Sequence, residues 1–393
     1  MRTRTSRAGA TGDIRMLAPT GLTREFSRRG LLAGAAAAGL LGLTGCGTPR
    51  AVADSPTADG KLESHVNLYS WGDYDPPEAI EAFTQSSGAT VQVDSFGSNE
   101  ELISKLAATR GTSGYDVVVP TGLMIPQMVE HQLLQPLRKD LIPNFSNMDP
   151  NFTDQVWDPG NKHSICKAWG TTGFVYDSSK IKRSMTSWQD FLEVAMGQAS
   201  GRTALLEDPW EVCSIALGAQ GADLNTTDEH ELDACEKAIV DKLAKHVRAY
   251  FGSASTGMVQ GGFMLMQSYN GDARQGMLEM DDPGKWKFVY PTPSANLWMD
   301  NWCIAAGAPH PDAAHALINH MISPDVAFEQ MDYIGYPVGT KGLAEAAQEE
   351  ELELPELIFP TQRVLDRLTA SELNEAQQRR VEIFSRAQAR SGA

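Results

Sequence analysis

The sequence has 393 residues, of which 33 are basic and 50 acidic, so its formal net charge at pH 7 is −17. A surface with this excess of acidic residues repels nucleic acid and attracts cations, although the charge alone is better explained by the solubility of a secreted protein. The five cysteines form no Cys-x-x-Cys pair and no close His follows them, which excludes the common zinc-binding patterns.

The first 45 residues are typical of an export signal. A basic stretch leads into Ser27-Arg28-Arg29-Gly30-Leu31-Leu32, and a small-residue apolar run continues to Gly45. This order matches a twin-arginine signal, and the run is too short and too rich in glycine for a membrane helix. The run ends in Leu43-Thr44-Gly45-Cys46, which resembles the lipobox of bacterial lipoproteins. We therefore expect a signal peptide over residues 1–45, a lipidated Cys46, and a flexible tether over residues 46–63.

From His65 onward, strand and helix patterns alternate, which favours an α/β fold. We expect strands at 65–71, 89–96, 114–120, 170–176 and 203–206, and helices at 76–87, 99–110, 187–196, 210–219 and 229–249. About 330 residues follow the tether, and because a single core stops growing near ~250–300 residues, this length favours two lobes. No phosphate-binding glycine motif occurs. The remaining cysteines, which are equally compatible with disulfides and free thiols, are Cys166, Cys213, Cys235 and Cys303.

Five short segments place an aromatic residue, in four cases with a carboxylate, where the chain is expected to leave a strand. They are Trp71-Gly72-Asp73-Tyr74, Asp208-Pro209-Trp210-Glu211, Tyr269-Asn270-Gly271-Asp272, Trp298-Met299-Asp300 and Ile334-Gly335-Tyr336-Pro337. Taken singly, each Trp is better explained as core and each Asp as a turn or cap residue. Taken together they fit an alkyl ammonium ligand, because strand ends converge on the crevice of an α/β sheet. A carboxylate at ~4 Å offers about 4 kcal/mol at an effective dielectric near 20, and each aromatic face adds ~0.5–2 kcal/mol.

At these segments the chain resembles the spermidine/putrescine-binding proteins of bacterial polyamine importers, over about residues 65 to 345. The matching runs, in chain order, are Leu68-Tyr69-Ser70-Trp71-Gly72-Asp73-Tyr74 with Pro76-Pro77, Tyr115-Asp116-Val117-Val118-Val119-Pro120, Asn144-Phe145-Ser146-Asn147-Met148-Asp149-Pro150, Trp169-Gly170-Thr171-Thr172-Gly173, Trp298-Met299-Asp300, and Ile334-Gly335-Tyr336-Pro337. The resemblance implies a two-lobe periplasmic binding protein fold of cluster type II, each lobe a mixed sheet flanked by helices. Lobe 1 would comprise residues 64–170 plus 299–344, and lobe 2 residues 171–298 plus 345–393.

The resemblance also implies a role for each candidate ligand-binding residue. Aromatic walls would come from Trp71, Tyr269 and Trp298, further walls or hydrogen-bond partners from Tyr74 and Tyr336, and ammonium-binding carboxylates from Asp208, Glu211 and Asp300. Asp272 matches a carboxylate of putrescine-binding members, and Asp73 matches a position that is acidic or polar in relatives. Thr121 matches the Ser or Thr that relatives usually have after the strand that ends in Pro120. Relatives usually have aromatics after that hydroxyl, where this chain has Gly122-Leu123-Met124. This departure leaves the length and identity of the ligand open.

The function predicted from these features is an extracytoplasmic lipoprotein that delivers spermidine or putrescine to the permease subunits of an ABC importer. We expect a monomer that is anchored to the cell membrane through Cys46 and has no enzymatic activity, no cofactor, no metal and no nucleic-acid partner. One alternative keeps the fold and changes the solute to an amino acid, another amine, a sugar or a ferric ion. A second alternative is a secreted hydrolase that uses two of the four carboxylates Asp208, Glu211, Asp272 and Asp300. The sequence has no nucleophile elbow or metalloprotease motif that would support catalysis.

Overall fold

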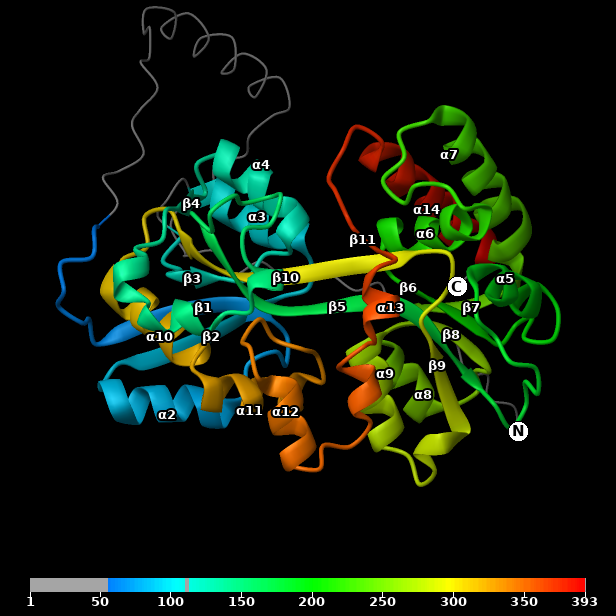
Figure 1. The fold of residues 1–393 in the computed structure, drawn as a ribbon. Helices are drawn as coiled ribbons and strands as arrows, with labels where there is room; N and C mark the ends of the chain where they lie inside the picture. The colour runs from blue at the N-terminus through cyan, green and yellow to red at the C-terminus, as the bar shows by residue number, and fades with distance from the viewer. Residues whose placement is uncertain (1–55, 110–112, 393) are drawn as a thin grey trace, which may run out of the picture. The chain divides into compact units, whose positions relative to one another are not determined.

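The computed structural model describes residues 56–109 and 113–392 (Figure 1). The expected export signal and Cys46 lie outside these residues. Within the described part of the chain, eleven strands form a sheet whose main order is β2-β1-β3-β10-β5-β8-β6-β7. Two short strands, β4 and β11, pair with β10, and β9 pairs with β5.

Helices and strands alternate as the α/β pattern predicts. The strands are β1 His65–Trp71, β2 Thr90–Phe96, β3 Val117–Val118, β4 Leu134–Gln135, β5 Ser164–Asp177, β6 Thr203–Leu206, β7 Val247–Phe251, β8 Leu265–Tyr269, β9 Trp286–Val289, β10 Ala295–Ala305 and β11 Leu368–Ala370. The helices are α2 Pro77–Ser87, α3 Asn99–Thr109, α4 Ile125–Glu130, α5 Trp188–Met196, α6 Pro209–Gln220, α7 Glu229–Glu236, α8 Ala254–Gln260, α9 Asn270–Leu278, α10 Pro311–Met321, α11 Pro324–Ile334, α12 Leu343–Glu349, α13 Gln362–Leu365 and α14 Gln377–Ser391.

The two long strands β5 and β10 run through the middle of the sheet (Figure 1). They pair with each other in antiparallel register, with Leu297 opposite Thr171 and Cys303 opposite Ser164. Beyond this shared stretch, β10 pairs with β3 and β4, whereas β5 pairs with β8 and β9. Every residue of β5 is buried, as expected for a strand that is covered on both faces. The two strands therefore connect the two parts of the sheet.

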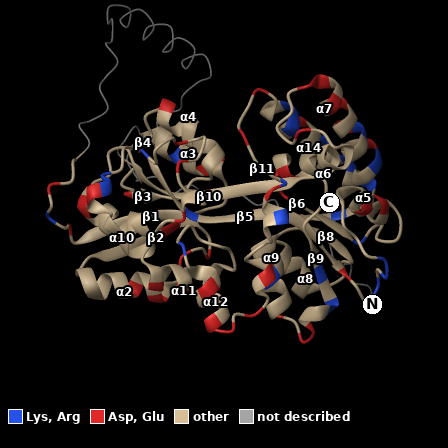
Figure 2. Ribbon diagram, in the orientation of Figure 1, with Lys and Arg blue, Asp and Glu red and all other residues tan. Residues whose placement is uncertain are grey.

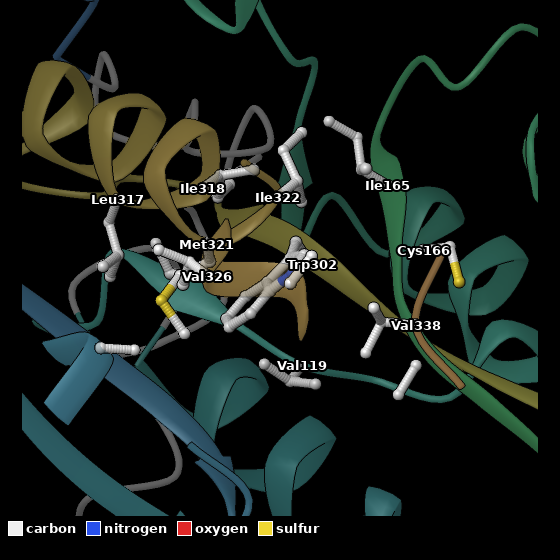
Figure 3. Packing of buried hydrophobic residues seen from close by; sticks show 14 of the residues in the cluster. Val119, Ile165, Cys166, Trp302, Leu317, Ile318, Met321, Ile322, Val326 and Val338 are labelled. Carbon is white, nitrogen blue, oxygen red and sulfur yellow. The ribbon is translucent and has the colours of Figure 1, made fainter. Parts of the chain in front are cut away.

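Each part of the sheet has its own hydrophobic clusters, a larger and a smaller one. In the first part, Trp302 of β10 packs with Val119 and with residues of α10 and α11, including Met321 and Val326 (Figure 3). In the second part, Phe174 of β5 packs against Trp188 and Phe191 of α5 with ring centroids 5.8 and 5.3 Å apart. Separate hydrophobic clusters on the two parts of the sheet, which the long strands β5 and β10 connect, agree with the predicted two-lobe α/β fold.

Helix capping follows the sequence closely. The Ser98 hydroxyl accepts a hydrogen bond from the Glu101 N–H at 3.2 Å, and the Glu101 carboxylate accepts one from the Gly97 N–H at 2.9 Å. Ser187 forms a full capping box with Asp190 at the start of α5. Both helix starts are confirmed.

Three predicted element boundaries were wrong. The predicted helix over 229–249 ends early, because α7 passes into a π-helical turn and a 3-10 turn, and residues 247–251 form strand β7 beside β6. Strand β3 is only two residues long, although its neighbour Val119 is also fully buried. Strand β5 begins at Ser164 and not at Gly170, because its pairing with β10 extends the strand towards the N-terminus.

Charged residues lie mainly on the helices and loops of the described chain, whereas most of β5 and β10 is uncharged (Figure 2). The thiols of Cys166, Cys213, Cys235 and Cys303 are all buried and free. No helix in residues 56–109 or 113–392 has the length and apolar character needed to span a bilayer.

Candidate functional site

A cavity of about 400 Å³ brings together residues from segments far apart in the sequence. Ten of the eleven predicted ligand-binding residues line it: Trp71, Tyr74, Thr121, Asp208, Glu211, Tyr269, Asp272, Trp298, Asp300 and Tyr336. The exception is Asp73, which is exposed and adopts a left-handed backbone with φ of 51° in the turn after β1. Its neighbours Gly72 and Tyr74 do line the cavity. The structure thus gathers the predicted set and leaves Asp73 outside it.

Asp300 of β10 is held by two hydroxyl groups. Tyr74 Oη donates to Asp300 Oδ2 at 3.0 Å, and Thr121 Oγ1 donates to Oδ1 at 2.7 Å. Thr121 is itself fixed by Asn99, whose Nδ2 donates to Thr121 Oγ1 at 3.0 Å. Asp300 is only 7% exposed, and burial raises the pKa of its carboxyl to about 6. An ammonium group bound next to Asp300 would offset the cost of burying the ionised carboxylate and so favour the ionised form.

A second pair of carboxylates lies at the start of α6. Asp208 caps the helix, its side chain accepting from the Glu211 N–H at 2.9 Å, so the helix-cap interpretation of Asp208 is also correct. Glu211 Oε1 accepts hydrogen bonds from Thr172 Oγ1 at 2.8 Å and Asn296 Nδ2 at 2.7 Å. Its Oε2 is buried and has no hydrogen-bond partner among the described residues. Burial, followed by the charge of Asp208, raises the pKa of Glu211 to about 8.

The fourth carboxylate, Asp272, lies in the first turn of α9. Tyr336 Oη donates to Asp272 Oδ1 at 2.7 Å, while Oδ2 is buried without a partner in the described chain. Burial raises the pKa of the Asp272 carboxyl above its ordinary value. Like Glu211, Asp272 therefore presents an unsatisfied oxygen that a hydrogen-bond donor would stabilise.

Aromatic rings form the cavity walls around these acids. The Trp298 ring meets Tyr336 edge-on with centroids 4.8 Å apart and meets Tyr269 at 5.7 Å, also edge-on. Trp71 packs against Phe96 at 4.6 Å. Rings held in this way keep their faces in place for cation–π contact and for the methylene chain between ammonium groups.

The position of the Trp298 ring depends on a glycine in the crossing strand β5. A Cβ added at Gly170 would lie 2.3 Å from a ring carbon of Trp298, a distance that no structure tolerates without movement. We expect Gly170→Ala to displace the ring and to weaken ligand binding at least about tenfold. Gly72→Ala is the matched control, because it also lines the cavity and its added methyl meets nothing within 4 Å. Equal affinities of the two variants in calorimetry would contradict the role of the ring.

Several cavity residues were not predicted from the sequence. Asn99 and Asn296 orient the predicted residues Thr121 and Glu211, and Trp210 lies between two predicted acids in the chain. Trp210 could have been included, because it stands inside the Asp208–Glu211 segment. The tail contributes Ser371 and Gln377, for which no local pattern exists. Leu123, at the position where the resemblance implied an aromatic residue, also lines the cavity.

The cavity contains acids and rings but no arrangement suited to a metal ion. Within residues 56–109 and 113–392, no group of three or more His, Cys, Asp or Glu side chains could hold one. The hydroxyl and amide groups that contact Asp300, Glu211 and Asp272 are hydrogen-bond donors, which favour the ionised carboxylates. The arrangement suits a ligand that brings several positively charged donors.

Comparisons with known proteins agree with this geometry. The family model of bacterial extracellular solute-binding proteins matches residues 78–355. The spermidine/putrescine-binding periplasmic protein of Escherichia coli is 31% identical, and the match covers 80% of this chain and 84% of that protein. The putrescine/agmatine-binding protein of Pseudomonas aeruginosa is 29% identical over 75% of this chain and 83% of its own length.

A solved structure gives the same result for the fold. The spermidine/putrescine ABC transporter substrate-binding protein of Streptococcus pneumoniae superimposes with a TM-score of 0.73 at 28% identity, covering 84% of this chain and 100% of that one. Such relatives are transport proteins and not enzymes, which removes the hydrolase alternative. The chain belongs to the bacterial extracellular solute-binding protein family, among the relatives of the spermidine/putrescine-binding proteins.

Proposed function

We propose that this protein binds a linear polyamine, such as spermidine or putrescine, and delivers it to an ABC importer. The observation that carries the proposal is one cavity, walled by aromatic rings and lined by six acidic residues, that brings together the carboxylates of Asp208, Glu211, Asp272 and Asp300. Burial raises the pKa of each of them, so their charges are costly until a cation arrives. The relatives whose names specify spermidine, putrescine or agmatine support the same class of ligand.

The physical basis is the replacement of water around separated ammonium groups. Each ammonium loses hydration on entering the cavity, and a carboxylate with a free oxygen, such as Glu211 or Asp272, offers a charge-assisted hydrogen bond in return. The ring faces of Trp71 and Trp298 suit the methylene segments between the charges. A neutral sugar supplies hydroxyl groups but no positive charge that could offset these acids, of which Glu211 and Asp300 are buried.

Closure of two lobes around the ligand is the mechanism we propose for capture. Lobe 1 would comprise residues 64–170 plus 299–344, and lobe 2 residues 171–298 plus 345–393. The crossing strands β5 and β10 support this division, since each pairs with different strands at its two ends. Asp300 and Glu211 would then hold the ligand from different lobes, so ligand binding stabilises the closed form.

We further propose that the protein acts outside the cytoplasmic membrane as a monomer attached through lipidated Cys46. The lipobox-like Leu43-Thr44-Gly45-Cys46 supports the anchor. Metabolic labelling with a fatty-acid precursor should mark the parent protein, and Cys46→Ala should abolish the label and release the protein from the membrane fraction. A Cys46→Ala protein that remains labelled would rule out this anchor.

The ligand class is tested by thermal unfolding of the exported domain with matched ligands. Spermidine and putrescine should raise the melting temperature, because a ligand at 1,000 times its Kd stabilises the native state by about 4.1 kcal/mol. 1,4-Butanediol has the same carbon chain as putrescine without the charges and should have no effect. Stabilisation by the diol or by a neutral sugar, and not by any amine, would refute the proposal.

A further inference from the structure

A buried ion pair lies beside the cavity near Asp300, and neither of its members lines the cavity. Lys167 Nζ lies 2.8 Å from Asp75 Oδ1, and the two side chains are 0% and 3% exposed. Nζ also donates to Gln330 Oε1 at 3.2 Å. Because desolvation offsets much of the attraction in a buried ion pair, stability alone is a poor explanation for this one.

An irregularity in strand pairing sets the position of Lys167. On β10, Asp300 pairs with Ala168 and the next residue, Asn301, pairs with Cys166. Lys167 is thus the extra residue of a β-bulge and has no partner on β10. Bulges redirect a side chain from the regular alternation of a strand. Here the bulge lies directly opposite the Asp300 backbone.

Tyr74 connects the ion pair to the cavity. Lys167 Nζ lies 4.7 Å from the centre of the Tyr74 ring and 4.2 Å from the Trp302 ring, both within cation–π range. The hydroxyl at the far end of the Tyr74 ring donates to Asp300 Oδ2 at 3.0 Å. Lys167 therefore contacts the face of the Tyr74 ring, and the hydroxyl of the same ring donates to Asp300, the carboxylate proposed to bind the amine.

The charge of Lys167 also acts on Asp300. The titratable groups that face Asp300 are Tyr74 after β1, Cys166 and Lys167 of β5, and Tyr269 at the end of β8. Lys167 is the cation in this group. Burial raises the pKa of Asp300 to about 6; the hydrogen bonds from Thr121 and Tyr74 limit the rise, and the charge of Lys167 limits it further.

We propose that Lys167, anchored by Asp75, is a positioning residue that fixes Tyr74 on Asp300 and keeps the Asp300 carboxylate ionised before the amine arrives. The inference rests on the proposed polyamine function, since it assigns the lysine a role in preparing that site. Its consequence is a wider pH range of capture. Without the lysine charge, Asp300 would be protonated at a higher pH and the site would lose affinity in mildly acidic surroundings.

The test compares spermidine affinity across pH for the parent and for Lys167→Met combined with Asp75→Asn, measured by calorimetry. If the lysine charge shifts the Asp300 equilibrium about tenfold, the variant should show its smallest loss of affinity at pH 8.5, where Asp300 is ionised in both proteins and only the support of Tyr74 is missing. Relative to that loss, the variant should bind about fivefold more weakly at pH 6 and about tenfold more weakly at pH 5. A ratio of affinities that stays constant from pH 5 to 8.5 would overturn the inference and leave the pair a structural role.

Matched variants separate charge from packing. Lys167→Arg keeps a cation and should retain the parent pH profile, whereas Lys167→Gln with Asp75→Asn is a second neutral pair for the case in which the first variant does not fold. Asp177→Asn with Lys180→Met removes a different lysine–aspartate pair, 2.9 Å apart with a fully buried Asp177, outside the cavity. This control should lower the melting temperature, but the ratio of its spermidine affinity to that of the parent should be the same at every pH.

A readout without ligand separates this inference from the proposed function. The difference in melting temperature between the parent and Asp300→Asn depends on pH through the ionisation of Asp300. When Lys167→Met and Asp75→Asn are also present, the pH at which this difference changes should rise by about one unit. A protein that binds no amine but shows this shift would refute the polyamine proposal alone, and an unchanged dependence would refute the role of Lys167.

Discussion

Replacing Asp300 by Asn should weaken amine binding at least about thirtyfold while the protein remains folded. The change keeps the shape of the side chain and an oxygen that can accept from Tyr74 or Thr121, so the local hydrogen bonds have replacements. It removes a buried charge that would face an ammonium, a loss that typically costs about 2–5 kcal/mol. Calorimetry with spermidine at pH 8, combined with thermal unfolding, measures the two effects separately.

Asp73→Asn is the matched control for this prediction. It removes the same charge from a residue of the predicted site that is exposed and lies outside the cavity. Asn tolerates the left-handed backbone at this position as well as Asp does. Its affinity should stay within about twofold of the parent. Equal losses in both variants would indicate a general effect of negative charge and would remove Asp300 from the site.

Replacing Glu211 by Gln should stabilise the free protein and weaken ligand binding at the same time. The folded-state pKa of Glu211, about 8, lies above its ordinary value of 4.5, so the parent loses stability as pH rises through this interval. At pH 7 the corresponding cost is about 3 kcal/mol. Gln does not titrate, so its advantage in melting temperature should grow between pH 4.5 and 8.

The same variant should bind spermidine at least about tenfold more weakly, because the amide offers no negative charge to an ammonium. In the parent, binding near pH 7 should release a proton from Glu211, which calorimetry in buffers of different ionisation enthalpy detects. Glu349→Gln, an exposed substitution on α12, is the control and should change neither property. A Glu211→Gln protein that is less stable than the parent at pH 7 would contradict the claim that the buried carboxylate of Glu211 destabilises the free protein.

The residues that could be predicted from sequence are those whose signal is local. Aromatic residues and acids at strand ends identified nine cavity residues, the family resemblance added Thr121, and capping motifs located the starts of α3 and α5. The family resemblance supplied the order of the segments and the two-lobe fold. The unpredicted residues act through contacts that sequence spacing does not reveal. Ser371 and Gln377 reach the cavity from a C-terminal segment, and strand β11 of that segment pairs with β10.

Tertiary pairing also explains the errors in secondary structure. Residues 247–249 were included in the predicted helix, yet pairing with β6 makes Val247–Phe251 a strand. The Lys167 bulge was likewise unpredictable, because it arises from the register between β5 and β10. Asp73 was included in the predicted site because it adjoins Trp71 and Tyr74, and the turn after β1 directs it to solvent.

A crystal structure of the exported domain grown with spermidine tests the arrangement of acids and rings most directly. We expect the amine to lie in the cavity with one ammonium nitrogen within about 3 Å of the Asp300 carboxylate and another within that distance of Glu211 or Asp272. Its methylene chain should pass between the rings of Trp71 and Trp298. An amine bound elsewhere on the protein, or held in the cavity without contact to any of the four carboxylates, would contradict the account.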